Sequence, residues 1–165
     1  LSRFFKKARA LGARVLFNPG PKELENVHEL VELLADVDIL VANKREAAKI
    51  VPGTVLTELL YHLNNYVTCA IITDSVMGGI AGNRIDNEFY RFGIYEDVKM
   101  RDATGAGDAF SSGFLASYAN GDSFYNSLVF ASANATAVVK TIGANGGILT
   151  GNEKLHMMPI QKITI

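Results

Sequence analysis

The stretch with the clearest capacity for chemistry is DATGAGDAF, which runs from Asp102 to Phe110. Small residues leave its backbone accessible just before Asp108, and a helix-like run follows. Glycine permits tight backbone conformations and the close approach of a ligand. The start of a helix offers free N–H groups that favour an anion. A carboxylate beside such a site is productive if Asp108 takes a proton from a nucleophile while the N–H groups hold a transferring phosphoryl group.

The motif alone supports two interpretations. In phosphoryl transfer, the backbone N–H groups of residues 105–108 stabilise charge on the transferring group. The Asp108 carboxylate then accepts the proton of the attacking hydroxyl. In the alternative, Asp108 only caps a helix and the glycines form a turn. The catalytic set predicted by the first interpretation is Asp108 with Gly105, Ala106 and Gly107.

Other chemistries lack their motifs. The histidines are scattered, so the sequence indicates neither a histidine metal cluster nor a nucleophile–histidine pair; they are His28, His62 and His156. Neither the G-x-S-x-G elbow nor the G-x-x-x-x-G-K-[ST] phosphate loop occurs. Gly105-x-Gly107 is followed by Phe110 where the dinucleotide fingerprint needs Gly or Ala, which disfavours a Rossmann cofactor site.

Length and composition fit one globular domain without a nucleic-acid or membrane partner. The chain has 165 residues, of which 48% are hydrophobic and 20% charged, enough for one full core. The net charge of −1 provides no general attraction to nucleic acid or anionic membrane. No apolar run approaches the roughly 18 residues that span a bilayer. The single cysteine, Cys69, lacks an internal disulfide partner, and we expect a reduced, cytoplasmic setting.

Hydrophobic periodicity predicts helices alternating with short buried strands in the first half of the chain. The expected elements are helices at 2–11, 22–35, 44–51 and 54–64, and strands at 14–17, 38–42 and 67–73. Asn43 and Thr54 are the expected N-caps of the third and fourth helices. This order indicates parallel strands with helical crossovers. The helix–glycine–strand opening suggests that the chain begins inside a larger protein, with a mitochondrial targeting peptide as the alternative.

The second half changes pattern. Short strands are expected at 77–82 and 87–93, with residues 94–99 extending the sheet. Helices are expected at 106–120 and, capped by Asp122 or Ser123, up to Val139. The inner face of the latter is expected to hold Phe124, Leu128, Ala131, Ala135 and Val138. A glycine-rich loop should cover 141–151, and 157–165 should add an edge strand. No internal repeat or linker is visible.

The motif DATGAGDAFSSGF resembles the second signature of the ribokinase-like (PfkB) carbohydrate kinases. Other segments resemble family segments in the same order: residues 16–21 a strand ending in Asn-Pro, 41–47 the N-x-x-E segment, 71–75 the T-x-G strand end, and 131–143 the helix beside the adenine. The resemblance runs through nearly the whole chain. It implies an α/β, ribokinase-like three-layer α/β/α fold with a mostly parallel sheet, of which residues 1–165 are the C-terminal portion of a single kinase domain.

The resemblance also implies roles for individual residues. Asp108 would be the catalytic base, and Gly105, Ala106 and Gly107 the anion hole. The remaining implied roles are Asn43 and Glu46 at Mg²⁺ and the ATP phosphates, Thr73 and Ser75 along the nucleotide, Ser132 and Asn134 near the adenine, and Asp102, Thr104 and Gly143 at a monovalent cation such as K⁺. From the residues alone, Asn43 and Glu46 are better interpreted as a helix cap and a solvated acid of its first turn.

Two positions and the length depart from the family pattern. Ala103 stands where a small hydroxyl residue is usual, and Ser75 replaces the glycine of T-x-G. Family members are roughly twice as long, and their N-terminal half carries most of the sugar site and the lid. The resemblance therefore implies an ATP-dependent sugar kinase, with a homodimer through the missing lid as a further expectation. A nucleoside or phosphosugar kinase and a non-catalytic nucleotide-binding module remain the alternatives.

Overall fold

The computed structural model describes residues 1–95, 98–144, 146–151, 153, 155 and 158–165. These residues divide into two compact units, Leu1–Arg91 with Gln161–Ile165, and Phe92–Ile160. The expectation that residues 1–165 form part of one kinase domain stays a prediction.

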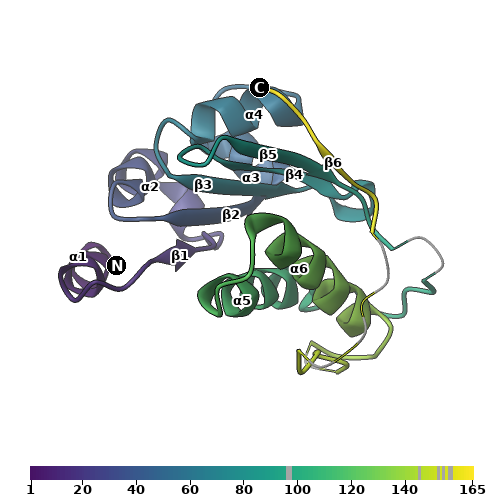
Figure 1. Cartoon of the computed structure of the whole chain (residues 1–165). Helices are drawn as coiled ribbons and strands as arrows, with labels where there is room; N and C mark the ends of the chain where they lie inside the picture. The colour runs from purple at the N-terminus through teal and green to yellow at the C-terminus, as the bar shows by residue number, and fades with distance from the viewer. Residues whose placement is uncertain (96–97, 145, 152, 154, 156–157) are drawn as a thin grey trace. The chain divides into compact units, whose positions relative to one another are not determined.

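The first unit is built on a mixed sheet with the order β1-β2-β3-β4-β5-β6 (Figure 1). The strands are β1 Leu16–Phe17, β2 Ile39–Asn43, β3 Cys69–Thr73, β4 Gly79–Asn83, β5 Glu88–Phe92 and β6 Ile160–Lys162. β1, β2 and β3 run parallel, whereas β4 is antiparallel to β3. The predicted α/β class and the parallel pairing of the first strands are therefore confirmed.

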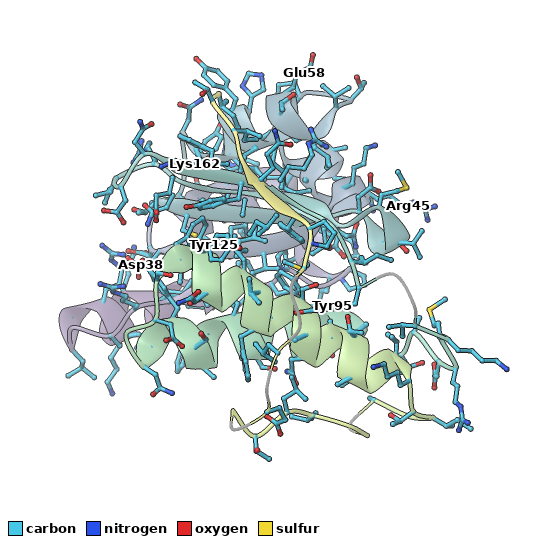
Figure 2. The ribbon with its side chains drawn as sticks, turned by 45° about the vertical axis from the view of Figure 1, so that its right-hand side comes forward. Asp38, Arg45, Glu58, Tyr95, Tyr125 and Lys162 are labelled. Atoms are coloured by element: carbon cyan, nitrogen blue, oxygen red, sulfur yellow. The ribbon has the colours of Figure 1, made fainter. Side chains whose placement is uncertain are left out.

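One helix precedes β1, and the others connect the parallel strands β1, β2 and β3, as expected for crossover connections. The helices are α1 Ser2–Ala10, α2 Val27–Leu34, α3 Lys44–Ile50 and α4 Leu56–Leu63, with short 3₁₀ turns at Glu23–Glu25 and Ser75–Met77. Asp38, labelled in Figure 2, directly precedes β2 and connects it by hydrogen bonds to α1 and to the residue before β1. Its carboxylate accepts hydrogen bonds from the Val15 N–H at 2.8 Å and from the Arg9 guanidinium at 2.9 Å.

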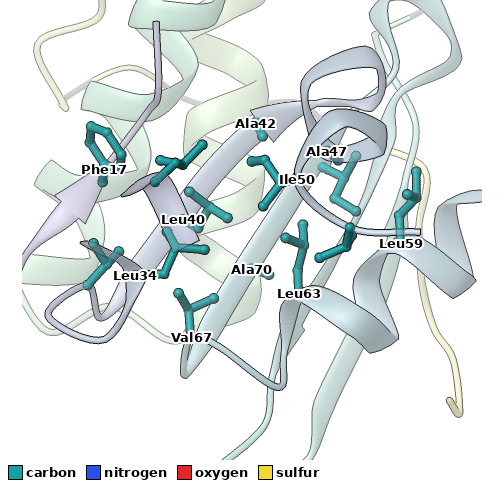
Figure 3. Close-up of a cluster of buried hydrophobic side chains, with 14 of the residues drawn as sticks. Phe17, Leu34, Leu40, Ala42, Ala47, Ile50, Leu59, Leu63, Val67 and Ala70 are labelled. Carbon is teal, nitrogen blue, oxygen red and sulfur yellow. The ribbon is translucent and has the colours of Figure 1, made fainter. Parts of the chain in front are cut away.

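The core of this unit lies between the sheet and its helices (Figure 3). Leu40 and Ala70 point from the sheet into this cluster, and Leu59 and Leu63 meet them from α4. All four are fully or almost fully buried. Successive strand residues face opposite sides of a sheet, and β2 and β3 are apolar at nearly every position, as is typical of strands buried on both faces. Burial also raises the pKa of the Cys69 thiol, which keeps it protonated.

The second unit contains two helices, α5 Ala106–Ala119 and α6 Phe124–Val139. Their predicted extents are confirmed. Of the two proposed caps, Ser123 is the N-cap of α6, and its hydroxyl accepts a hydrogen bond from the Asn126 N–H at 3.1 Å. Asp122 instead accepts a hydrogen bond from the Ser117 hydroxyl at 2.7 Å. On the inner face of α6, Ala135 is only half-buried.

Two predicted helix starts are wrong. The helix expected from residue 22 begins at Val27, because Asn26 leaves helical geometry (φ −124°, ψ 83°) and accepts a hydrogen bond from the Glu29 N–H. The helix expected from Thr54 begins at Leu56 with Val55 as its N-cap. The Thr54 N–H donates to the Glu58 carboxylate at 3.1 Å, so Glu58 takes part in the cap by reaching back.

The expected extension of the sheet through 94–99 is also wrong where it is described. Residues 94, 95, 98 and 99 belong to no strand, and residues 96 and 97 lie outside the described residues. The expected edge strand is confirmed as β6, which is shorter than predicted, while Met157 lies outside the described part. Among the described residues, no helix is long and apolar enough to cross a membrane.

The buried face of α4 provides a test of this core. Leu63 is 0% exposed, so Leu63→Ala should lower the free energy of unfolding by about 2–5 kcal/mol through lost apolar contact and a cavity. Tyr61 on the same helix is 59% exposed, and Tyr61→Ala should change it by less than about 1 kcal/mol. Urea denaturation measures both. Equal effects of the two substitutions would contradict the assigned core.

Candidate active site

The turn before α5 requires glycine at position 105. Gly105 is the N-cap of α5 and has φ +80°, in the left-handed region that side chains disfavour. A Cβ at this position would also lie 2.6 Å from the carbonyl oxygen of Ala144 and 2.8 Å from its Cα. Both backbone conformation and close packing therefore exclude a side chain, and the loop around Ala144 is held directly against the helix start.

The first turn of α5 presents unpaired donors beside a free acid. Within the described part of the chain, the N–H groups of Gly105, Gly107 and Asp108 have no hydrogen-bond partner, whereas the Ala106 N–H donates to the Ala103 carbonyl at 3.3 Å. Asp108 is exposed, and its carboxylate has no partner among the described residues. A Cβ on Gly107 would meet no atom within 4 Å. The turn thus has the donors and the space that an anion requires.

Asp102 joins this motif to the loop after α6. Its carboxylate accepts a hydrogen bond from the Thr104 N–H at 2.9 Å and another from the Gly143 N–H at 3.0 Å. Hydrogen bonds from the Thr104 side chain and backbone, and then from the Gly143 backbone, hold the pKa of Asp102 below its ordinary value. The structure therefore brings together the three residues predicted at the monovalent cation. Their role there stays a prediction.

The loop itself is tied to the end of α6. The Thr141 hydroxyl lies 2.9 Å from the Val138 carbonyl and 2.8 Å from the Gly146 carbonyl. Gly147 has φ +79°, and a Cβ there would lie 2.6 Å from the Ala137 carbonyl. Asn145 of this loop lies outside the described residues.

The two residues predicted near the adenine are both buried on α6. Ser132 is 5% exposed and Asn134 2%. The Asn134 side chain donates to the Ala109 carbonyl at 2.8 Å and accepts from the Leu149 N–H at 2.8 Å. These bonds give Asn134 a structural role that its sequence neighbourhood did not indicate. An adenine contact for either residue stays a prediction.

In the first unit, Asn43 and Thr73 lie next to each other. They are paired in register at the carboxyl ends of parallel strands β2 and β3. Asn43 also begins α3 with a capping box, in which its side chain accepts from the Glu46 N–H at 3.0 Å and the Glu46 carboxylate accepts from the Asn43 N–H at 2.8 Å. The interpretation of Asn43 as a helix cap is thus confirmed, whereas Glu46 is not merely a solvated acid of the first turn, because its carboxylate completes the cap.

Sequence reasoning missed an ion pair at the same strand ends. The Lys44 ammonium lies 3.4 Å from the Asp74 carboxylate. Both residues follow the last positions of neighbouring strands, which is the signal that would have found the pair.

Ser75, which directly follows Asp74, has φ +53°. The residue that replaces the family glycine therefore adopts the backbone conformation that glycine favours.

Comparison with known proteins identifies the family. A model described as pfkB family carbohydrate kinase matches residues 1–150. The chain belongs to this family. It is 26% identical over 146 residues to a 5-dehydro-2-deoxygluconokinase of Lacticaseibacillus casei, covering 84% of this chain and 44% of the relative. The PfkB chain therefore spans less than half of that curated relative.

Solved structures share the fold of this chain. Adenosine kinase from Sinorhizobium meliloti matches with a TM-score of 0.79 and 26% identity, over 87% of this chain and 44% of its own. Ribokinase of Arabidopsis thaliana, solved with ribose and ATP, matches with a TM-score of 0.72 and 23% identity, over 85% and 46%. The predicted ribokinase-like fold, present in part, is confirmed.

The conformation of Ser75 leads to a stability prediction. Ser75→Gly should raise the free energy of unfolding by up to about 1 kcal/mol, because glycine adopts φ +53° without the steric cost of a Cβ. Ser112→Gly, at an exposed position inside α5, should lower it by about 0.5–1 kcal/mol. Thermal and urea unfolding measure both. A loss of stability in Ser75→Gly would show that the left-handed conformation is not maintained.

The Asp102 hydrogen bonds predict a dependence on pH. Because the folded-state pKa is lowered, the carboxylate contributes stability above the ordinary Asp pKa of about 3.9 and loses it as pH falls through the folded value. Asp102→Asn should therefore be less stable than the parent near neutral pH, and the difference should shrink below about pH 4. Denaturation at a series of pH values tests this, and a difference independent of pH would contradict it.

Proposed function

We propose that this chain is the nucleotide-handling, C-terminal portion of a ribokinase-like domain whose complete protein transfers the γ-phosphoryl group of ATP to a hydroxyl of a sugar or sugar-containing acceptor. The observation that carries this proposal is the first turn of α5. The N–H groups of Gly105, Gly107 and Asp108 are unpaired among the described residues, and the exposed Asp108 carboxylate lies in the same turn. Membership of the carbohydrate kinase family supports it.

In this proposal the chain's residues divide the chemistry between them. Asp108 accepts the proton of the acceptor hydroxyl as the hydroxyl attacks. The N–H groups of Gly105, Ala106 and Gly107 stabilise the charge that develops on the transferring group, which requires the Ala106 N–H to give up its long 3.3 Å bond to Ala103. The Gly105 and Gly107 N–H groups need no such change among the described residues, and preorganised donors are effective because they need no reorientation during the reaction.

Mg²⁺ fits the Asn43–Glu46 pair as a hydrated ion. One oxygen of the Glu46 carboxylate is engaged by the Asn43 N–H, and the other has no partner among the described residues. The described part of the chain contains no cluster of three or more acidic, histidine or cysteine side chains suited to a metal. Mg²⁺ typically keeps several waters and is held by one or two carboxylates with the substrate phosphates. It would neutralise phosphate charge, while Glu46 orients one of its waters.

The remaining assignments follow from the family resemblance. Thr73 and Ser75 would lie along the nucleotide, and a K⁺ ion would lie near Asp102, Thr104 and Gly143. The Asp102 oxygens already accept two N–H groups, so this carboxylate orients the loop rather than presenting an open ligand. A homodimer and a cytoplasmic location, where ATP and reduced thiols occur, complete the proposal.

The acceptor defines the second candidate function. Similarity to adenosine kinase from Sinorhizobium meliloti favours a nucleoside acceptor, whereas similarity to 5-dehydro-2-deoxygluconokinase favours a sugar derivative. A coupled ADP-release assay of the complete protein with nucleosides, free sugars and phosphosugars separates these classes. Calorimetric nucleotide binding without phosphorylation of any acceptor would instead favour a non-catalytic nucleotide-binding module.

The proposed base makes a direct prediction. In the complete protein, Asp108→Asn should lower kcat by on the order of 10²-fold or more, because the hydroxyl loses its proton acceptor. Calorimetry should show that ATP binding is retained. Asp122→Asn, at the other end of α5, is the matched control and should leave kcat unchanged. An unchanged kcat in Asp108→Asn would exclude Asp108 as the base.

A further inference from the structure

We propose that Asn134 is a positioning residue that holds the first turn of α5 and the glycine-rich loop after α6 in a fixed relation. This inference rests on the proposed function, because the turn and the loop are the parts of the second unit assigned to phosphoryl transfer. It differs from the adenine contact that the family resemblance implies for this residue. Its hydrogen-bond partners Ala109 and Leu149 and its neighbour Gly113 lie within the second unit.

Both polar atoms of the Asn134 side-chain amide form hydrogen bonds. It is 2% exposed, and its amide nitrogen donates to the Ala109 carbonyl at 2.8 Å. Its amide oxygen accepts from the Leu149 N–H at 2.8 Å. Ala109 immediately follows Asp108, and Leu149 lies two residues beyond Gly147 at the end of the loop. A single buried amide thus connects α6 to both segments.

Gly113 provides the space for this amide. A Cβ on Gly113 would lie 3.1 Å from both Cβ and Nδ2 of Asn134 and 3.4 Å from the Cα of Ala131. These distances show that α5 and α6 approach closely at this point, as small residues allow. A glycine inside a helix costs helix propensity, and the contact with Asn134 explains why that cost is accepted in the middle of α5.

Asn134 completes a series of three links along the same loop. Gly143 donates to the Asp102 carboxylate, Ala144 packs against Gly105, and Leu149 is joined through Asn134 to Ala109. The first two links fix the approach to the turn, and the third fixes the residue that follows Asp108. Displacing a reacting group by about 1 Å can cost on the order of 10²-fold in rate. Asn134 therefore acts on the reaction through Asp108 and the adjacent N–H groups, without touching the substrate.

Hydrogen exchange tests the links without requiring activity. In Asn134→Ala, the Leu149 amide loses its acceptor and should exchange at least about 10-fold faster. Ser127→Ala is the matched control, because among the described residues this buried hydroxyl of α6 donates to the Ser123 carbonyl alone. It should leave Leu149 exchange unchanged. Unchanged exchange in Asn134→Ala would overturn the proposal.

Kinetics of the complete protein distinguish positioning from nucleotide contact and from a purely structural role. Asn134→Ala and Gly113→Ala should each lower kcat per folded molecule by on the order of 10-fold, with a smaller change in KM for ATP. The double variant should be no slower than Asn134→Ala, because both substitutions act through one contact. Ser127→Ala should keep kcat. If Asn134→Ala does not fold, Leu149 hydrogen exchange and kcat are both measured on Gly113→Ala instead.

Failure of the positioning role and failure of the proposed function would give different results. A kcat within twofold of the parent in the folded variants, or an effect confined to the KM of ATP and to the choice between ATP and GTP, would overturn the positioning role. If the parent protein phosphorylates no acceptor, the proposed function fails. The exchange measurement then still decides whether Asn134 joins the turn to the loop.

Discussion

The second unit depends on the close contact between Gly105 and Ala144. A left-handed backbone at Gly105 turns the chain into α5, and its missing side chain lets the Ala144 backbone approach to a distance that any Cβ would prevent. Asp102 reinforces the contact by accepting the Gly143 N–H. Because the loop occupies the side of the turn, the donors at the start of α5 keep a defined direction. The proposed anion site thus depends on packing as much as on helix polarity.

The elements defined by local chemistry could be predicted from the sequence. Ser123 caps α6 where expected, and Asn43 caps α3, because each side chain satisfies a backbone donor within three residues. The buried strands β2 and β3 followed from their apolar runs and from the helices between them. Residues 102–108 were found for the same reason, since small residues before an acid and a helix form a local pattern. Family resemblance then supplied the chemistry that this pattern alone left open.

Features that depend on distant neighbours could not be predicted in this way. Nothing near Asn134 in the sequence indicates a bond to Ala109, which is 25 positions away. The helix start at Leu56 depends on the Glu58 carboxylate reaching back to the Thr54 N–H, and apolar periodicity does not register such a bond. Asn26 illustrates a different error. Its side chain is a recognisable N-cap, but apolar residues recur at helical spacing on both sides of it, and this periodicity suggested one continuous helix. Tertiary contacts and competing local signals account for these errors.

Two acids have structural tasks at positions where the family resemblance implies metal-ion binding. The Glu46 carboxylate caps α3 with one oxygen and keeps the other free of partners in the described chain. Asp102 orders a loop while its pKa is held low, so it remains an acceptor at physiological pH. A side chain fixed by one interaction loses less conformational entropy when it binds a ligand with its remaining atoms. Within each unit, hydrogen bonds that stabilise the fold therefore also fix side chains proposed to bind ligands, and removing one of them should affect folding and ligand binding together.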